Sequence, residues 1–290
     1  MKPLILKSPA KINLYLEILN KRPDGYHNLK TIFEKVNLCD QITLKPRPDA
    51  LIKLSCTGFS VPRGSSNLAW RAAEFLRKRQ RIEKGLDIKI KKSIPPASGL
   101  GGGSSNAACV LLGLNRLWRL GLSKSQLINY AKELGSDVAF FIQDYPFALA
   151  SSRGDKIKPL DNINSKFWHI LVVPHKEIPT KLAYELWDKN KNHRLTTAKR
   201  GVRITLLALQ QNSLKLFAKG FYNSFTEISQ RLCPDILEIK KKMEDAGVKA
   251  VSMSGKGPAV FGIVSTGKEA IECKRQLKNG AWSVFIVKTF

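Results

Sequence analysis

The chain has 290 residues, of which 43% are hydrophobic and 25% are charged. This composition is typical of a globular protein and excludes a disordered one, while the length exceeds what one hydrophobic core usually supports. Lys and Arg outnumber Asp and Glu by 49 to 23, giving a formal net charge of +26. The charge favours anionic partners such as nucleic acid, an anionic membrane surface or a phosphorylated metabolite. Because the basic residues are spread along the chain, a generally basic, solvated surface is an equally open interpretation.

Cysteine and hydropathy patterns indicate a cytoplasmic protein. The five cysteines are far apart and lack Cys-x-x-Cys spacing, so we expect reduced thiols. The four histidines show no metal-ligand spacing, and residues 1–19 lack the features of a signal peptide. The longest uncharged run, residues 93–115, contains Pro95, Pro96 and several glycines. We therefore expect no membrane span.

In chain order, alternating residues predict strands over 4–7 and 12–19, joined by a turn that ends at Lys11. Lys11 and Asn13 have ordinary interpretations as a surface lysine and a turn residue. Loops at strand ends also often carry functional side chains.

A second turn is predicted at Pro23-Asp24-Gly25. Tyr26 and His27 follow it directly. They either begin the next strand, or display an aromatic ring and an imidazole suited to a planar base.

The next elements lead to a glycine-rich loop. The alternation and helical periodicity predict strands at residues 31–38, 41–45, 51–56 and 86–91, and a helix at residues 67–79.

The loop itself, residues 95–108, reads Pro-Pro-Ala-Ser-Gly-Leu-Gly-Gly-Gly-Ser-Ser-Asn-Ala-Ala. Four glycines in five residues are costly to order, which indicates a close approach of the backbone to something. Apolar periodicity predicts a buried helix over 107–118, with Ser104, Ser105 and Asn106 as candidate N-caps. Free N–H groups and the positive helix end would then converge on one point, where a phosphate fits.

Two familiar glycine loops are excluded. A Walker A loop needs a lysine after its last glycine, but Gly103 is followed by Ser104. The spacing of Gly99, Gly101 and Gly103 also departs from the Gly-x-Gly-x-x-Gly dinucleotide fingerprint. The ordinary alternative is a tight turn that packs a strand against a helix.

After a predicted helix over 123–134, Asp137 stands beside the apolar run 138–142. One interpretation is a helix N-cap. The other is a partly buried carboxylate facing the glycine loop, which needs a cation such as Lys11 beside it.

A polar stretch at residues 151–164 predicts a domain boundary, giving domains 1–155 and 156–290. The second domain has an α+β pattern. Its predicted parts are strands at 167–173, 248–253, 259–264 and 282–287, helices at 181–188, 214–228, 235–246 and 268–277, a basic loop at 189–203 and a glycine turn at 254–258.

Three segments resemble the motifs of the GHMP small-molecule kinases. They are Ser8-Pro9-Ala10-Lys11-Ile12-Asn13, the loop at 95–108, and Met253-Ser254-Gly255-Lys256-Gly257-Pro258-Ala259-Val260-Phe261. Arg22-Pro23-Asp24-Gly25-Tyr26-His27 further resembles the mark of one family among them. That family phosphorylates the 2-hydroxyl of 4-diphosphocytidyl-2-C-methyl-D-erythritol in the non-mevalonate route to isoprenoid precursors.

The resemblance implies an N-terminal domain similar to domain 2 of ribosomal protein S5, a ferredoxin-like C-terminal domain and an active site between them. It implies ATP and Mg²⁺ as cofactors, small-molecule partners, and neither nucleic acid nor membrane. The implied catalytic residues are Lys11 and Asp137. The implied ATP-binding residues are Asn67, Pro96, Ala97, Ser98, Gly99, Leu100, Gly101, Gly102, Gly103, Ser104 and Ser105, with Ser104 or Ser105 near the metal. The implied acceptor-binding residues are Asn13, Tyr26, His27 and Tyr184, the last as one face of a cytosine sandwich.

The sequence departs from the family pattern at two places. Ala97 and Ser98 replace glycines of some relatives, which is tolerable if their φ angles are negative. Lys256 stands where a small hydroxyl residue is more usual. We expect it to add a cation that faces phosphate.

Two other functions stay open. One is a GHMP kinase with another acceptor, such as mevalonate or a sugar. The other is a nucleic-acid-binding module, motivated by the charge of +26. The aromatic residues argue against the module, because they lie mostly within apolar runs and do not interleave with the basic residues.

Overall fold

The structure, a computed structural model, describes residues 2–161, 163, 165–190 and 198–290. Its contacts divide the chain into two compact units. The first comprises Met1–Ala10, Leu38–Pro96 and Gly101–Asp144, and the second comprises Lys11–Asn37, Ala97–Leu100 and Tyr145–Phe290. The units are therefore not separated by one cut in the chain, and the boundary between residues 155 and 156 stays a prediction.

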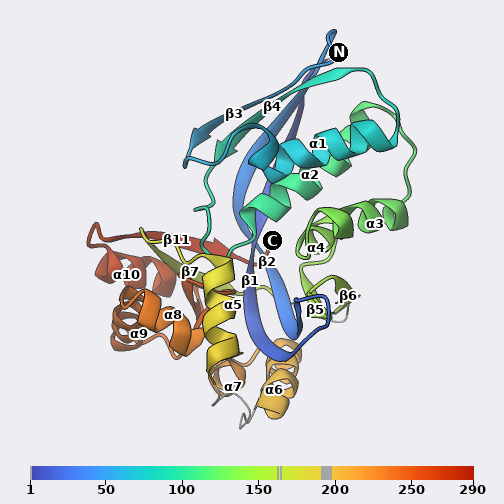
Figure 1. Cartoon of the computed structure of the whole chain (residues 1–290). Coiled ribbons are helices and arrows are strands. Elements are labelled where there is room, and N and C mark those ends of the chain that lie inside the picture. The colour runs from blue at the N-terminus through green and yellow to red at the C-terminus, as the bar shows by residue number, and fades with distance from the viewer. Residues whose placement is uncertain (1, 162, 164, 191–197) are drawn as a thin grey trace. The chain divides into compact units, whose positions relative to one another are not determined.

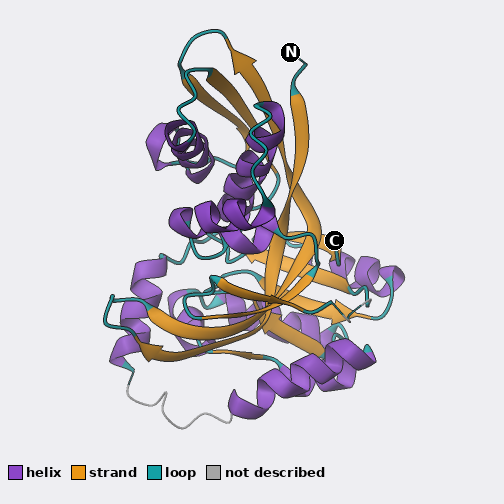
Figure 2. Ribbon diagram, turned by 90° about the vertical axis from the view of Figure 1, so that its right-hand side faces the viewer, coloured by secondary structure: helices purple, strands orange, loops and turns teal. Residues whose placement is uncertain are grey.

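Two long strands belong to both units. Strands β1 (Leu4–Lys21) and β2 (His27–Arg47) each run without a break, and β1 can be followed from the N-terminus in Figure 2. The sequence predicts two short strands in place of each. The prediction is wrong because Ser8-Pro9-Ala10-Lys11 continues β1 in extended form.

The first unit packs helices on a sheet. Its other elements are β3 (Ile52–Gly58), α1 (Leu68–Arg79), β4 (Gly85–Lys92), α2 (Gly102–Leu117), α3 (Lys124–Leu134) and α4 (Val138–Ile142). Strand β4 pairs antiparallel with β2 and parallel with β3. Figure 1 shows α1 and α2 lying together against this sheet. At Gly113, α2 lies so close to β2 that a Cβ atom added there would be 2.5 Å from Leu44 Cδ1.

Helix α2 begins earlier than predicted. Its N-cap is Gly101, with φ +69°, so Ser104, Ser105 and Asn106 lie within the first turns of the helix. The prediction of these three as N-caps is wrong, and the side chains of Ser105 and Asn106 instead form buried hydrogen bonds. The prediction for α3 is confirmed, since Ser123 and Gln126 form a capping box.

The second unit contains a separate four-stranded sheet with the order β11-β7-β10-β9. Its core joins inward residues of that sheet, such as Ile170 and Val172, with residues of α9 and α10, such as Ile239 and Cys273. Its remaining elements are β5 (Phe147–Ser151), β6 (Lys156–Pro159), β7 (Trp168–Pro174), α5 (Thr180–Lys189), α6 (Ala198–Gln211), α7 (Leu214–Gly220), β8 (Tyr222–Asn223), α8 (Thr226–Leu232), α9 (Asp235–Asp245), β9 (Ala250–Met253), β10 (Val260–Val264), α10 (Gly267–Leu277) and β11 (Trp282–Lys288).

The predicted helix over 214–228 is interrupted. Strand β8 separates α7 from α8, because Tyr222 and Asn223 pair in parallel with Tyr15 and Leu16 of β1. The Asn223 side chain also donates to the carbonyl oxygens of Met253 and Gly255, each at 2.8 Å. Long-range hydrogen bonds thus override a helical pattern.

Two loop predictions also differ. The polar stretch 151–164 contains β6, which pairs with β5. Of the predicted basic loop 189–203, residues 191–197 lie outside the described residues, and α6 begins at Ala198. In the part of the chain that the structure describes, no helix is both long and apolar enough to cross a membrane.

Candidate active site

The first half of the glycine loop is held through its backbone by the turn between β9 and β10 and by Lys11 of β1. The carbonyl oxygens of Ala97–Leu100 all accept hydrogen bonds. In order, the donors are Lys256 Nζ at 2.9 Å, Ala259 N at 3.1 Å, Ser254 Oγ at 2.9 Å and Lys11 N at 2.9 Å. The C=O and N–H of a trans peptide point in opposite directions, so the N–H groups of Gly99 and Leu100, which follow the carbonyls of Ser98 and Gly99, face away from the turn. Successive N–H groups that face one side form a site for an anion.

Glycine is required at position 99. Its φ is +85°, and a Cβ atom there would lie 2.2 Å from the carbonyl oxygen of Ser254. The condition of a negative φ is not met at Ala97, whose φ is +51°. This left-handed conformation is unfavourable for alanine, and the Lys256 hydrogen bond helps to hold it.

The side chain of Lys256 contacts the backbone of the glycine loop. Its Nζ donates to the carbonyl oxygens of Ala97 and Ile178. Burial lowers the pKa of Lys256 to about 8, with Lys11 contributing and the nearby Glu177 opposing the shift. Both donor contacts are to backbone, which differs from the expected cation facing phosphate.

Lys11 is held by a chain of hydrogen bonds within the second unit. Only 4% of Lys11 is exposed, so the surface-lysine interpretation is wrong. Its Nζ donates to Asn13 Oδ1 and lies 5.1 Å from the centre of the Phe33 ring. Asn13 Nδ2 donates to Thr31 Oγ1 at 2.7 Å, and Thr31 Oγ1 donates to the carbonyl oxygen of Tyr15 at 2.6 Å. These bonds fix the amide of Asn13 and, through it, the ammonium group.

A cluster of rings and charges joins the turn before β2 to helix α5. The rings of His27 and Tyr184 are stacked, with centroids 4.9 Å apart and an interplanar angle of 23°. His27 Nε2 lies 2.6 Å from Asp188 Oδ1, and Lys21 Nζ lies 2.6 Å from Asp188 Oδ2. Tyr26 is 55% exposed, and the guanidinium of Arg153 lies 5.0 Å from its ring centre.

Asp188 fixes the orientation of His27. Burial raises the pKa of Asp188, but hydrogen bonds from Lys21 and His27 outweigh this and leave the pKa below its usual value. The carboxylate is thus an acceptor, so His27 Nε2 carries the hydrogen that it donates. Sequence reasoning missed Asp188, although its i+4 spacing from Tyr184 places both on one face of α5.

In the first unit, a buried carboxylate holds the start of α2. Asp40 accepts hydrogen bonds from Lys92 Nζ at 2.5 Å, Asn106 Nδ2 at 2.8 Å, Ser93 N at 2.8 Å and Ile94 N at 2.9 Å. Burial lowers the pKa of Lys92, and Asp40 opposes that shift. A Cβ atom on Gly102 would lie 2.8 Å from Lys92 Nζ, so a lysine from β4 lies at this helix start.

Sequence reasoning missed this pair as well. The signal is the alternation in β4, where Leu86, Ile88 and Ile90 are buried while Lys89 and Lys91 are exposed. The same alternation places Lys92 on the buried face.

The remaining predicted residues of the first unit differ in how their side chains are used. Asp137 occupies the N-cap position of α4, but its side chain makes no capping hydrogen bond. Ser105 is buried and its Oγ accepts a hydrogen bond from Ser8 Oγ at 2.8 Å, whereas Ser104 is partly exposed. Asn67 caps α1 by accepting from Ala69 N at 2.9 Å. Asp137 and Lys11 belong to different units, and their pairing stays a prediction.

The described residues include no group of three or more His, Cys, Asp or Glu side chains that could hold a metal ion.

Comparisons with known proteins agree with these features. Residues 67–148 match the GHMP kinases N terminal domain, and residues 205–282 match the GHMP kinases C terminal domain. The chain is 39% identical over its whole length to all of the 4-diphosphocytidyl-2-C-methyl-D-erythritol kinase of Geobacter sp. (strain M21). It is 38% identical to the protein of the same name from Syntrophotalea carbinolica, over 97% of each chain.

Solved structures give the same result. A 4-(cytidine 5'-diphospho)-2C-methyl-D-erythritol kinase superposes with a TM-score of 0.82 at 30% identity, over 98% of each chain. The homoserine kinase of Cytophaga hutchinsonii shares the fold, with a TM-score of 0.75 at 18% identity, over 99% of this chain and 94% of that one. The chain thus has the two-domain GHMP kinase fold and belongs to the family of 4-diphosphocytidyl-2-C-methyl-D-erythritol kinases.

Proposed function

We propose that this protein transfers the γ-phosphoryl group of ATP to the 2-hydroxyl of 4-diphosphocytidyl-2-C-methyl-D-erythritol, a step of isoprenoid precursor synthesis. Full-length relatives that carry the corresponding kinase name support the proposal. The observation that carries it is the His27–Tyr184–Asp188 cluster, because it brings aromatic rings and charged groups together at the segment that marks this family. Five unpaired cysteines favour a reducing compartment such as the cytosol.

The exposed ring of Tyr26 is the natural surface on which the cytosine stacks, with the His27–Tyr184 pair at its edge. His27 and Tyr184 already lie at stacking distance, so no base fits between them. A complete sandwich between Tyr26 and Tyr184 requires the His27–Tyr184 stack to separate when substrate binds. Because His27 donates Nε2–H to Asp188, its Nδ1 is left to face the base.

For the triphosphate, we propose the outward N–H groups of residues 99–101 and the N-terminus of α2. Mg²⁺ would arrive with ATP and offset its charge. Ser104 is the better candidate for a hydroxyl near the metal, since Ser105 is buried against Ser8.

For the chemical step, we propose that Asp137 accepts the proton of the acceptor hydroxyl and that Lys11 offsets the charge of the developing alkoxide. Asn13 is then a positioning residue that aims Lys11. This division of work fits phosphoryl transfer, which depends mainly on positioning and on charge stabilisation.

The test is ATP turnover by the purified protein with and without 4-diphosphocytidyl-2-C-methyl-D-erythritol, with the product followed by ³¹P NMR. We expect ADP release to depend on this acceptor and a new phosphomonoester signal to appear. Mevalonate, homoserine and galactose serve as control acceptors. Turnover with one of them and none with the cytidine compound would overturn the acceptor assignment.

A further inference from the structure

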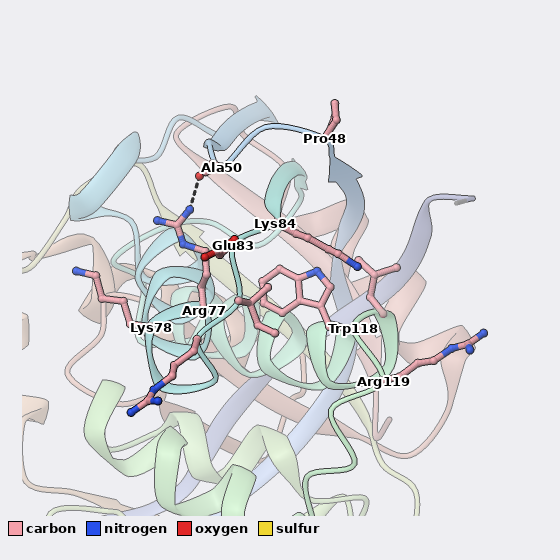
Figure 3. A pocket seen from close by; sticks show the side chains of 11 residues that line it. Pro48, Ala50, Arg77, Lys78, Glu83, Lys84, Trp118 and Arg119 are labelled. Atoms are coloured by element: carbon pink, nitrogen blue, oxygen red, sulfur yellow. Dashed lines mark hydrogen bonds between the residues drawn. The ribbon is translucent and has the colours of Figure 1, made fainter.

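A pocket lies in the first unit, where the C-terminal ends of α1 and α2 meet the turn between β2 and β3 (Figure 3). Its volume is about 1400 Å³, larger than the usual 300–1,000 Å³ of a small-molecule site. Its lining comes from residues 48–50, 77–84 and 117–119. None of these residues has a role in the candidate active site.

The pocket carries a surplus of positive charge. Five of its lining side chains are basic, and Glu83 is the one acidic side chain among those that line it. Arg77 is already engaged, because it pairs with Glu74 at 2.6 Å and donates to the carbonyl oxygen of Ala50. Within the described residues, Arg81, Lys84 and Arg119 have no ion-pair partner. Their charges are available to an anion.

An indole donor lies among these cations. Trp118 Nε1 is shielded from solvent and has no hydrogen-bond acceptor among the described residues. A buried indole N–H usually has a partner, so the atom indicates a missing acceptor. In Figure 3 the side chain of Lys84 extends toward this indole. Ile82 and Leu117 add apolar surface around it.

The backbone at the rim is unusual in the same way at both helix ends. Arg81 has φ +52° and Arg119 has φ +53°, at the positions after the C-caps of α1 and α2, where glycine is favoured. A cation beside the negative end of a helix is favourable and would explain an arginine at each site. This interaction with the helix end does not explain the unpartnered indole N–H or the pocket beside it.

We propose that this pocket binds a nucleotide. Arg81, Lys84 and Arg119 contact its phosphate oxygens, and its base packs against the apolar surface around Trp118. Binding turns the indole so that its N–H, which is shielded in the free protein, donates to a ligand oxygen. Phosphate recognition by arginine and base contact with an aromatic side chain are the common means of binding nucleotides. The nucleotide is either a free nucleoside phosphate or part of a single-stranded RNA, and the net charge of +26 suits both.

The experiment follows the indole ¹H–¹⁵N signals of the five tryptophans during titration with guanosine 5′-diphosphate. The Trp118 signal is the one that disappears in Trp118→Phe, so its shift reports this pocket even if the probe also enters the active site. We expect it to move, and we expect pyrophosphate to bind there at least tenfold more weakly than the nucleotide.

The decisive variant is the double substitution Arg81→Gly and Arg119→Gly. Glycine is favoured at these positive φ angles, so the variant should fold, and its ATP turnover should be unchanged without added guanosine 5′-diphosphate. We expect at least a tenfold loss of affinity at Trp118. The charge-matched control, Lys89→Gln with Lys91→Gln, alters two exposed lysines of β4 and should retain the affinity.

A second titration with hexauridylate at several salt concentrations separates the two sources. Tighter, strongly salt-dependent binding than that of the free nucleotide identifies RNA, and the reverse identifies a free nucleotide. The proposal is overturned if the Trp118 signal stays fixed with every probe. It is equally overturned if both double variants behave alike, or if pyrophosphate binds as well as the nucleotide. None of these results bears on the kinase activity.

Discussion

The two halves of the candidate active site are built in different ways. The phosphate half is one continuous segment, residues 97–106, and it presents backbone N–H groups that are oriented by hydrogen bonds to the preceding carbonyls. The acceptor half joins His27 and Asp188, which lie 161 positions apart, and it presents side-chain rings and charges. An added Cβ atom should therefore disturb the phosphate half, and a changed side chain should disturb the acceptor half.

The largest expected effect belongs to a side chain of the first unit, Asp137. Backbone groups can bind the phosphates, but the proposed chemical step also needs a carboxylate that accepts the proton of the acceptor hydroxyl. We expect Asp137→Asn to lower kcat by about 10²–10⁴-fold while KM for both substrates changes little, because the variant loses a positioned base. Steady-state kinetics will measure this, with Asp144→Asn as the control because Asp144 is exposed and pairs only with Lys124 among the described ion pairs. An unchanged kcat would remove Asp137 from the chemistry.

The second effect tests the acceptor half. Tyr184 stacks on His27 in this structure and on the cytosine in the complete sandwich, so Tyr184→Ala removes a base-stacking ring, a loss that costs on the order of 1–3 kcal/mol. We expect KM for the cytidine substrate to rise by roughly 5–150-fold, and KM for ATP to stay within a factor of two to three. Tyr184→Phe keeps the ring and should behave like the unchanged protein. Equal losses for both substrates in Tyr184→Ala would contradict a separate acceptor half.

The contrast between one continuous segment and residues far apart in the chain also explains what the sequence could predict. The phosphate half was predictable because Gly99, Gly101, Gly102 and Gly103 lie together and each choice of residue limits the local backbone. Most helices and strands followed from periodicity, and Ser123 marked the start of α3. These signals are local.

Long-range contacts were not predictable from such signals. Asn223 interrupts a helical pattern because it hydrogen-bonds to the turn after β9. Ala97 adopts a positive φ although alanine disfavours it, with Lys256 of a distant turn bound to its carbonyl. The Asp40–Lys92 pair likewise joins β2 and β4 across 52 positions. The turn before Tyr26 and His27 left recognition of a planar base open for these two residues, whereas the role of Tyr184 rested on family resemblance alone, since no spacing connects it to them.

The third effect concerns the backbone of the phosphate half. In Gly99→Ala the new Cβ would overlap the carbonyl oxygen of Ser254, and φ is positive. We expect unfolding to become easier by about 1–3 kcal/mol, measured by urea denaturation. Gly103→Ala is the matched control, because Gly103 is helical and a Cβ atom added there would have no neighbouring atom within 4 Å. Its stability should be unchanged or slightly higher. Equal destabilisation of both variants would contradict a specific contact at Gly99.

The last effect is a pH dependence at the place where the glycine loop meets the turn after β9. Lys256 has a pKa of about 8 in the folded protein against an ordinary value of 10.5. Between these values the unfolded chain binds more protons than the folded one, so the free energy of unfolding should rise with pH across this interval. Below pH 8 both states are protonated, and the contribution of Lys256 should be constant.

Urea denaturation of the protein and of Lys256→Met between pH 7 and 10 will measure the difference. The neutral amine still has two hydrogens to donate to Ala97 and Ile178, so deprotonation removes the cost of burying a charge and leaves both hydrogen bonds in place. We expect the stability of the unchanged protein, relative to Lys256→Met, to increase above pH 8. A relative stability that falls over this interval would mean that Lys256 needs its charge, and that this end of the phosphate half depends on a side chain as the acceptor half does.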